Sequence, residues 1–149
     1  MDVLRYILIA LLLSIGASAC SKEPYDRRYI EKYKPAAYVI QCEHGIPACI
    51  VLAQACLESG FGRSIAARHF HNHFGIKLND ECKQYDTVDE CFSDYARILT
   101  SFKRYEPLFE LCVKDYRGWA QGLQDCGYCS DKYYATKLIC IIEKYKLYE

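Results

Sequence analysis

The sequence carries no net charge, because 19 lysines and arginines balance 19 aspartates and glutamates among its 149 residues. No run of basic residues forms an arm or a patch, so we do not expect nucleic acid to be a partner. Internal repeats and low-complexity segments are also missing. The length suits one domain with a true hydrophobic core.

The longest apolar run near the start, residues 6–13, is too short for a membrane-spanning helix with anchoring flanks. Arg5 precedes it and the small residues 17–19 follow, so residues 1–19 are typical of a secretory signal. Cys20 comes next, and "ASAC" resembles a bacterial lipobox, with Ala17 in place of the commoner leucine. We expect export to the cell envelope with a lipid anchor on Cys20. The alternative is simple cleavage, which gives a secreted or periplasmic protein.

Ten cysteines in an exported chain indicate disulfides, although the sequence does not fix their pairing. The "CGYC" stretch at 126–129 has no second C-x-x-C to complete a zinc site, so core packing or a local disulfide is favoured. His69, His71 and His73 alternate along the chain, but no aspartate or cysteine completes a ligand set. No metal or other cofactor is expected.

Apolar spacing predicts a short linker at 20–28 followed by a mostly helical single domain at 29–149. Pro35 predicts a break between a first short helix and a second that ends at Gly45. Pro47 then opens a strongly apolar helix, at its first position, which Gly60 ends. Only the stretch between His71 and Asp86 leaves room for strands.

Two further helix starts are predicted from side chains that cap backbone N–H groups. Thr87 and Glu90 form a capping box ahead of an apolar helical stripe. Ser130 is expected to cap the last helix.

Glu58 closes the most apolar helix, in the stretch "AQACLESGFGRS". Partial burial and the negative end of the helix dipole both disfavour its charged form, and no basic residue lies within the preceding turn. A raised pKa is what a general acid requires near neutral pH. Following glycines allow a substrate to approach closely. Gln54, one turn earlier, is placed to hydrogen-bond Glu58 or a ligand. A purely structural carboxyl that caps backbone amides remains the alternative.

Four blocks together resemble one known family. They are, in order, "GIPACIVLAQACLESGFGRS", "HNHFGIK", "YDTVDECFSDYARIL" and "GYCSDKYYATKLICIIEKYKLY". In this order they resemble the mannosyl-glycoprotein endo-β-N-acetylglucosaminidase-like domain, glycoside hydrolase family 73, from about residue 29 to 148. Its members are bacterial peptidoglycan hydrolases of lysozyme-like fold. The resemblance implies a mostly α, lysozyme-like single domain.

The resemblance also implies roles for individual residues. Glu58 falls on the family's catalytic acid, and Tyr128 falls on an aromatic residue near the scissile bond. Asn72, His73 and Phe74 lie in the block beside the sugar. The implied partner is the peptidoglycan glycan strand, cut at the β-1,4 bond on the N-acetylglucosamine side.

The sequence departs from the family in one place. Only residues 78–84 stand where the family usually has a longer β-lobe, so we expect a much reduced β-lobe and a shallow groove. The alternatives include an accessory domain or a partner that completes the groove. Asp80 and Glu81 are the remaining carboxylates there, and no motif assigns either as a second catalytic group.

These features leave alternatives open. Substrate assistance is favoured over two carboxylates, with the sugar's acetamide attacking C1 and Tyr128 orienting it. Rival activities are muramidase and lytic transglycosylase. A non-catalytic glycan-binding module is the alternative from another class.

Overall fold

Residues 23–149 are described by the computed structural model, and residues 1–19 and Cys20 lie outside the described part. The elements, in chain order, are α1 (Glu23–His44), α2 (Ala48–Ser59), α3 (Ile65–Phe70), β1 (Lys77–Leu78), β2 (Glu81–Cys82), α4 (Val88–Ser101), the 3-10 helix η1 (Lys103–Glu110), α5 (Tyr116–Asp125) and α6 (Tyr134–Tyr145).

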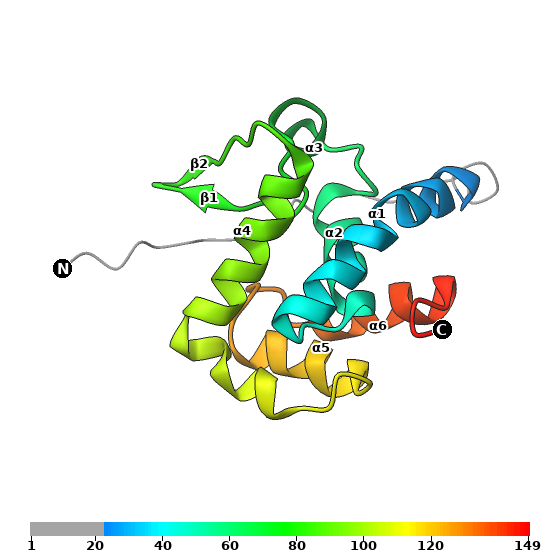
Figure 1. Ribbon diagram of the computed structural model, residues 1–149, viewed down its shortest axis with the longest axis vertical. Coiled ribbons are helices and arrows are strands. Elements are labelled where there is room, and N and C mark those ends of the chain that lie inside the picture. The colour runs from blue at the N-terminus through cyan, green and yellow to red at the C-terminus, as the bar shows by residue number, and fades with distance from the viewer. Residues whose placement is uncertain (1–22) are drawn as a thin grey trace.

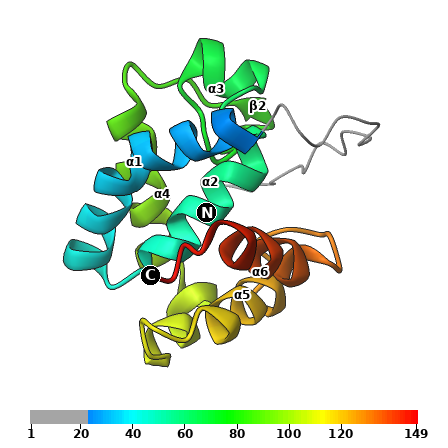
Figure 2. The same ribbon diagram turned by 90° about the vertical axis from the view of Figure 1, so that its right-hand side faces the viewer.

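Helix α2 is the centre of the fold. Most of its side chains are buried, as expected for a helix that is apolar on nearly every face. It packs against α1, α5 and α6. Figures 1 and 2 show α5 and α6 at one end of the molecule, and α3 with the β-hairpin at the other. The carboxyl end of α2 therefore lies between two groups of elements, and Glu58 is on its last turn.

Helix α1 runs without a break through Pro35, so the prediction of two separate helices is wrong. Proline removes one helical N–H and leaves the carbonyl of residue 31 without its usual donor. Both Glu31 and Pro35 are exposed, so water can satisfy that carbonyl. The helix also begins at Glu23, inside the stretch 20–28 that was expected to be a linker.

Helix boundaries follow the predicted caps in part. The Thr87 hydroxyl accepts a 3.2 Å hydrogen bond from the Glu90 amide, which confirms this start of α4. Pro47 precedes the first residue of α2, one position earlier than predicted. Ser130 does not cap the last helix, because α6 begins only at Tyr134. Asp131 acts in the preceding turn instead, where its carboxylate accepts a 2.9 Å bond from the Tyr133 amide.

The β-lobe is a single hairpin in the described chain. Strand β1 pairs antiparallel with β2, with Lys77 opposite Cys82 and Leu78 opposite Glu81. The two turn residues, Asn79 and Asp80, have φ of 53° and 65°, as a tight two-residue hairpin turn requires. The prediction of a mostly helical domain with a much reduced β-lobe is confirmed.

All nine cysteines between residues 23 and 149 are free thiols, so the expected disulfides are not formed in this part of the chain. Cys56 and Cys91 are fully buried and serve as small apolar core residues. Among the described helices, none has the length and apolar character needed to cross a membrane.

Candidate active site around Glu58

The backbone turns away directly after Glu58. Gly60 adopts a left-handed conformation with φ of 57°, and its N–H bonds the carbonyl of Cys56. Left-handed backbone favours glycine and is a common helix end. The last turn of α2 contains no basic residue, so the carboxyl of Glu58 has no cation from its own helix.

A chain of hydrogen bonds inside the protein reaches the Glu58 carboxyl. The Tyr95 hydroxyl donates to Gln54 Oε1 at 2.5 Å, and Gln54 Nε2 donates to the Tyr134 hydroxyl at 2.9 Å. Tyr134 in turn donates to Glu58 Oε1 at 2.9 Å. Burial raises the pKa of both tyrosines well above the usual value, so each hydroxyl keeps its single proton. The chain therefore has one direction and ends on Oε1.

Burial raises the pKa of Glu58 from 4.5 to about 7. The hydrogen bond from Tyr134 and the charge of Lys137 act in the opposite direction, but they are smaller effects. Near neutral pH a large share of this carboxyl is protonated, which is the state that a general acid needs. The sequence-based expectation of a raised pKa agrees with this environment.

The second carboxyl oxygen, Oε2, faces Gly75. A Cβ at this glycine would lie 3.8 Å from Oε2, and the residue has φ of 64°. Next to it, the Phe74 ring stacks on the Tyr95 ring with centroids 4.0 Å apart. The "HNHFGIK" block thus folds against the carboxyl, and Gly75 has no side chain that would cover Oε2 from its direction.

The four residues predicted to contact sugar are all buried; Gln54, Asn72, His73 and Phe74 have exposed fractions of 3% or less. Gln54 is held by two tyrosine hydroxyls, as described above. Asn72 braces its own loop, donating to the carbonyls of Ile76 and Lys83 at 2.7 and 2.8 Å. Gln54, Asn72 and Phe74 make their contacts within the protein, close to Glu58. His73 instead lines a separate hollow on the other side of its loop.

Tyr128 is also buried, with 3% of its surface exposed. Its ring stacks on Tyr134, with centroids 5.6 Å apart and planes 23° apart. The tyrosine that bonds Glu58 directly is therefore Tyr134. A signal was present, since Tyr134 lies in the same "GYCSDKYYATKL" block as Tyr128.

The remaining candidates lie apart from the carboxyl. Asp80 and Glu81 are exposed at the turn of the hairpin, which extends from the body of the molecule in Figure 1. Within residues 23–149, no group of three or more histidine, cysteine or acidic side chains is arranged to hold a metal ion.

Comparison with known proteins places this geometry in context. The family profile described as mannosyl-glycoprotein endo-beta-N-acetylglucosaminidase matches residues 34–147. The exo-glucosaminidase LytG of Bacillus subtilis is 31% identical over 96% of this chain and 63% of its own length. The peptidoglycan hydrolase FlgJ of Escherichia coli K12 is 29% identical, over 81% of this chain and 47% of its own length. The chain thus spans about half to two thirds of these curated relatives.

Solved structures show the same fold. The catalytic domain of the autolysin Auto from Listeria monocytogenes superposes with a TM-score of 0.74, at 22% identity, covering 91% of this chain and 92% of its own. The glycoside hydrolase domain of FlgJ from Salmonella typhimurium has a TM-score of 0.68 at 27% identity, covering 81% and 88%. These neighbours confirm the predicted lysozyme-like fold. The chain belongs to the mannosyl-glycoprotein endo-beta-N-acetylglucosaminidase family.

Proposed function

We propose that this protein is a peptidoglycan hydrolase that cleaves the β-1,4 bond on the N-acetylglucosamine side of the glycan strand, with Glu58 as the general acid. The observation that carries the proposal is the Glu58 carboxyl itself. Burial raises its pKa to about 7, Tyr134 holds one oxygen, and the other faces a glycine. Family membership and the names of the relatives support the substrate class.

In the proposed first step, Glu58 transfers its proton from Oε2 to the glycosidic oxygen as the bond between that oxygen and C1 breaks. The hydrogen bond from Tyr134 stabilises the carboxylate that forms on Glu58. Tyr95 and Gln54 keep that donor aimed at Oε1. Tyr134 is therefore a positioning residue that also favours the charged product of the proton transfer.

Substrate assistance supplies the second group in this proposal. The groups that shift the pKa of Glu58 are Tyr134 and Lys137, and neither is a carboxylate. A retaining enzyme with two carboxylates places them about 5 to 5.5 Å apart, where a second charge would raise the first pKa. The sugar's 2-acetamido oxygen attacks C1 instead and forms a cyclic oxazolinium ion. Water then adds to C1 as the bond between C1 and the acetamido oxygen breaks, which restores the acetamide, and the water returns one proton to Glu58.

Tyr128 takes an indirect part in the proposed site. It was expected to orient the acetamide, but its ring is buried against Tyr134. We infer that Tyr128 holds the Tyr134 ring in place and so acts on Glu58 through it.

The test is release of soluble fragments from purified sacculi by the native protein and by Glu58→Gln. We expect native release of muropeptides with a reducing N-acetylglucosamine end, identified by mass spectrometry. Glu58→Gln should be at least about 100-fold slower, because glutamine cannot donate the proton. Binding to sacculi without any release would instead favour the glycan-binding module. A reducing N-acetylmuramic acid end would favour a muramidase, and a 1,6-anhydro end a lytic transglycosylase.

A cell-envelope location is consistent with the relatives named as acting on peptidoglycan. We propose further that Cys20 carries a lipid that anchors the protein to the membrane, and that a partner or accessory domain completes the shallow groove. Metabolic labelling with an alkyne fatty acid tests the anchor. Label on the native chain that is absent from Cys20→Ser is the expected result, and equal labelling of both contradicts it.

A further inference from the structure

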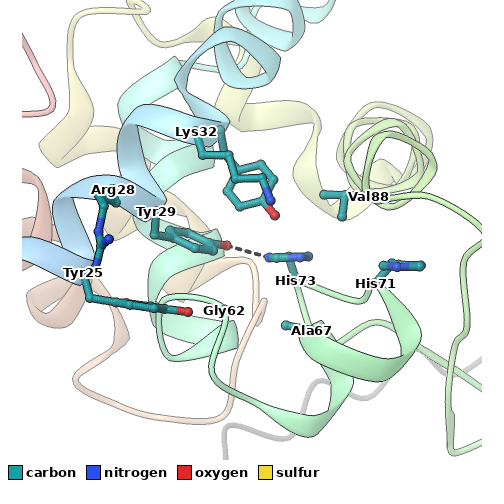
Figure 3. Close-up of a pocket in the computed structure, with 10 residues that line it drawn as sticks. Tyr25, Arg28, Tyr29, Lys32, Gly62, Ala67, His71, His73 and Val88 are labelled. Carbon is teal, nitrogen blue, oxygen red and sulfur yellow. Dashed lines mark hydrogen bonds between the residues drawn. The ribbon is translucent and has the colours of Figure 1, made fainter. Parts of the chain in front are cut away.

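A hollow of about 430 Å³ lies on the other side of the loop that contains Gly75. Glu58 does not line it. Figure 3 shows the residues that do, with one face of α1 opposite the two loop histidines; they are Tyr25, Arg28, Tyr29, Lys32, Tyr33, Gly62, Ala67, His71, His73 and Val88. Its size is within the range of small-ligand sites. The loop of residues 71–75 thus turns His73 toward the hollow and Gly75 toward Glu58.

Among the described residues, the lining of the hollow contains positive charge and no carboxylate. Arg28 and Lys32 lie one turn apart on α1, and no aspartate or glutamate lines the site. None of the ion pairs found among residues 23–149 includes either cation. By contrast, the neighbouring Arg63 is paired with Asp26 at 2.6 Å. Arg28 lies over the Tyr25 ring and Lys32 over the Tyr33 ring, at 5.9 and 5.1 Å from the ring centroids. A cation over a ring keeps its full charge, so two cations without a carboxylate partner favour an anionic ligand.

His73 adds a neutral donor to these cations. Its Nδ1 lies 2.7 Å from the Tyr29 hydroxyl, drawn as a dashed line in Figure 3. The Tyr29 hydroxyl also lies 3.1 Å from Ser59 Oγ and 3.4 Å from the carbonyl oxygen of Ala55. We assign its proton to the shortest of the three contacts, the one with Nδ1 of His73. With Nδ1 as the acceptor, the neutral ring carries its proton on Nε2. Burial, then the charge of Lys32, lowers the pKa of His73 to about 4, so the ring is neutral at physiological pH.

The walls are aromatic, and they are held close together. Tyr29 packs edge-on against Tyr33, with ring centroids 4.8 Å apart. Gly62 lies so close to Tyr29 that a Cβ there would approach the ring to 2.8 Å. Flat tyrosine rings pack against peptide groups and methyl groups, and the two cations donate charged hydrogen bonds to a carboxylate.

We propose that this hollow binds the free carboxylate of a short peptide, with Arg28 and Lys32 as its ion partners and His73 as a hydrogen-bond donor. That the peptide belongs to the stem peptides of peptidoglycan rests on the proposed function. The site is separate from the one that holds the scissile bond, so the protein contacts wall peptide and wall glycan through different surfaces.

The test is NMR titration of the full-length chain with acetyl-D-alanyl-D-alanine and with its C-terminal amide. We expect saturable shifts at the amides of Gly62, His71 and His73 for the acid. The amide and the Arg28→Gln, Lys32→Gln double variant should each bind about tenfold more weakly or worse, because a charged hydrogen bond is lost. Lys34→Gln, on the same helix but outside the hollow, is the matched control and should bind normally.

Several results would overturn the proposal. They are equal binding of acid and amide, no saturable shift with either, or shifts confined to the Glu58 side. Acetate that binds as tightly as the dipeptide would refute the peptide assignment. Circular dichroism checks the fold of the double variant, and each single glutamine variant repeats the test if the double variant is unfolded. Because the dipeptide has no glycosidic bond, binding without sacculus hydrolysis would refute the proposed function alone.

Discussion

The Glu58→Gln substitution should stabilise this protein at alkaline pH and leave its stability nearly unchanged at acidic pH. In the folded chain the pKa of Glu58 is raised from 4.5 to about 7, so folding favours the protonated carboxyl. The stability that this proton gives is complete below pH 4.5 and is lost as pH rises through 7. The shift corresponds to about 3 kcal/mol of unfolding free energy. Glutamine stays neutral at every pH and can still accept the bond from Tyr134.

The pH profile of the native protein alone would hide this effect. The pKa of His73 is lowered from 6.5 to about 4, so its contribution to stability rises with pH over that window. The contribution of Glu58 to the unfolding free energy falls with rising pH over nearly the same window. The pH dependences of the two residues therefore oppose each other. The difference between the native protein and Glu58→Gln removes the His73 contribution, because both proteins carry that histidine.

Urea unfolding at several values between pH 4 and pH 8.5 gives the required difference. Trp119 is the single tryptophan and is fully buried, so its fluorescence reports unfolding. We expect the variant to gain about 3 kcal/mol relative to the native protein at pH 8.5, or roughly 10 °C in melting temperature. Glu31→Gln, an exposed glutamate on α1, is the control for loss of one charge. A stability difference that is the same at every pH would refute the raised pKa.

Two other substitutions test the contacts around the site. Tyr134→Phe removes the hydrogen bond that lowers the pKa of Glu58. The alkaline limb of the pH–rate profile should therefore move to higher pH, by about one pH unit, while the rate falls. A limb that stays at the same pH would contradict the role of Tyr134. Gly62→Ala places a methyl group 2.8 Å from the Tyr29 ring at a φ of 77°, and should destabilise the fold by about 2 to 4 kcal/mol by chemical denaturation. Gly45 also has a left-handed φ, of 72°, but no neighbour within 4 Å, so Gly45→Ala should cost clearly less; equal losses would show that contact with Tyr29 is unimportant.

Much of the helical framework was predictable because it follows from local rules. The apolar helix that Gly60 ends and the Thr87 cap were predicted from the sequence, and the hairpin lies in the one stretch that left room for strands. Pro35 shows where local rules fail, because an exposed face of α1 lets water replace the missing donor. The number of cysteines and the expected export suggested disulfides, but the described cysteines are free, because bond formation depends on distances that the sequence does not contain.

The environment of Glu58 was predictable, but its long-range contacts were not. A carboxyl at the end of a buried helix implied the raised pKa. The hydrogen bond from Tyr134 joins residues 76 positions apart, and that from Tyr95 to Gln54 joins residues 41 apart. Contacts of this length depend on how α4 and α6 pack on α2. The family resemblance implied that Asn72 lies beside the sugar, yet its side chain donates to backbone carbonyls of its own loop region.

The small hairpin has a consequence for how such an enzyme would work on an insoluble wall. Strands of two residues offer few side chains to close over a bound strand from that side. We expect weak retention of the cut ends and rapid product release, so that each encounter with the mesh gives one cut before the enzyme departs. Processive travel along a single strand would require a second element to hold it.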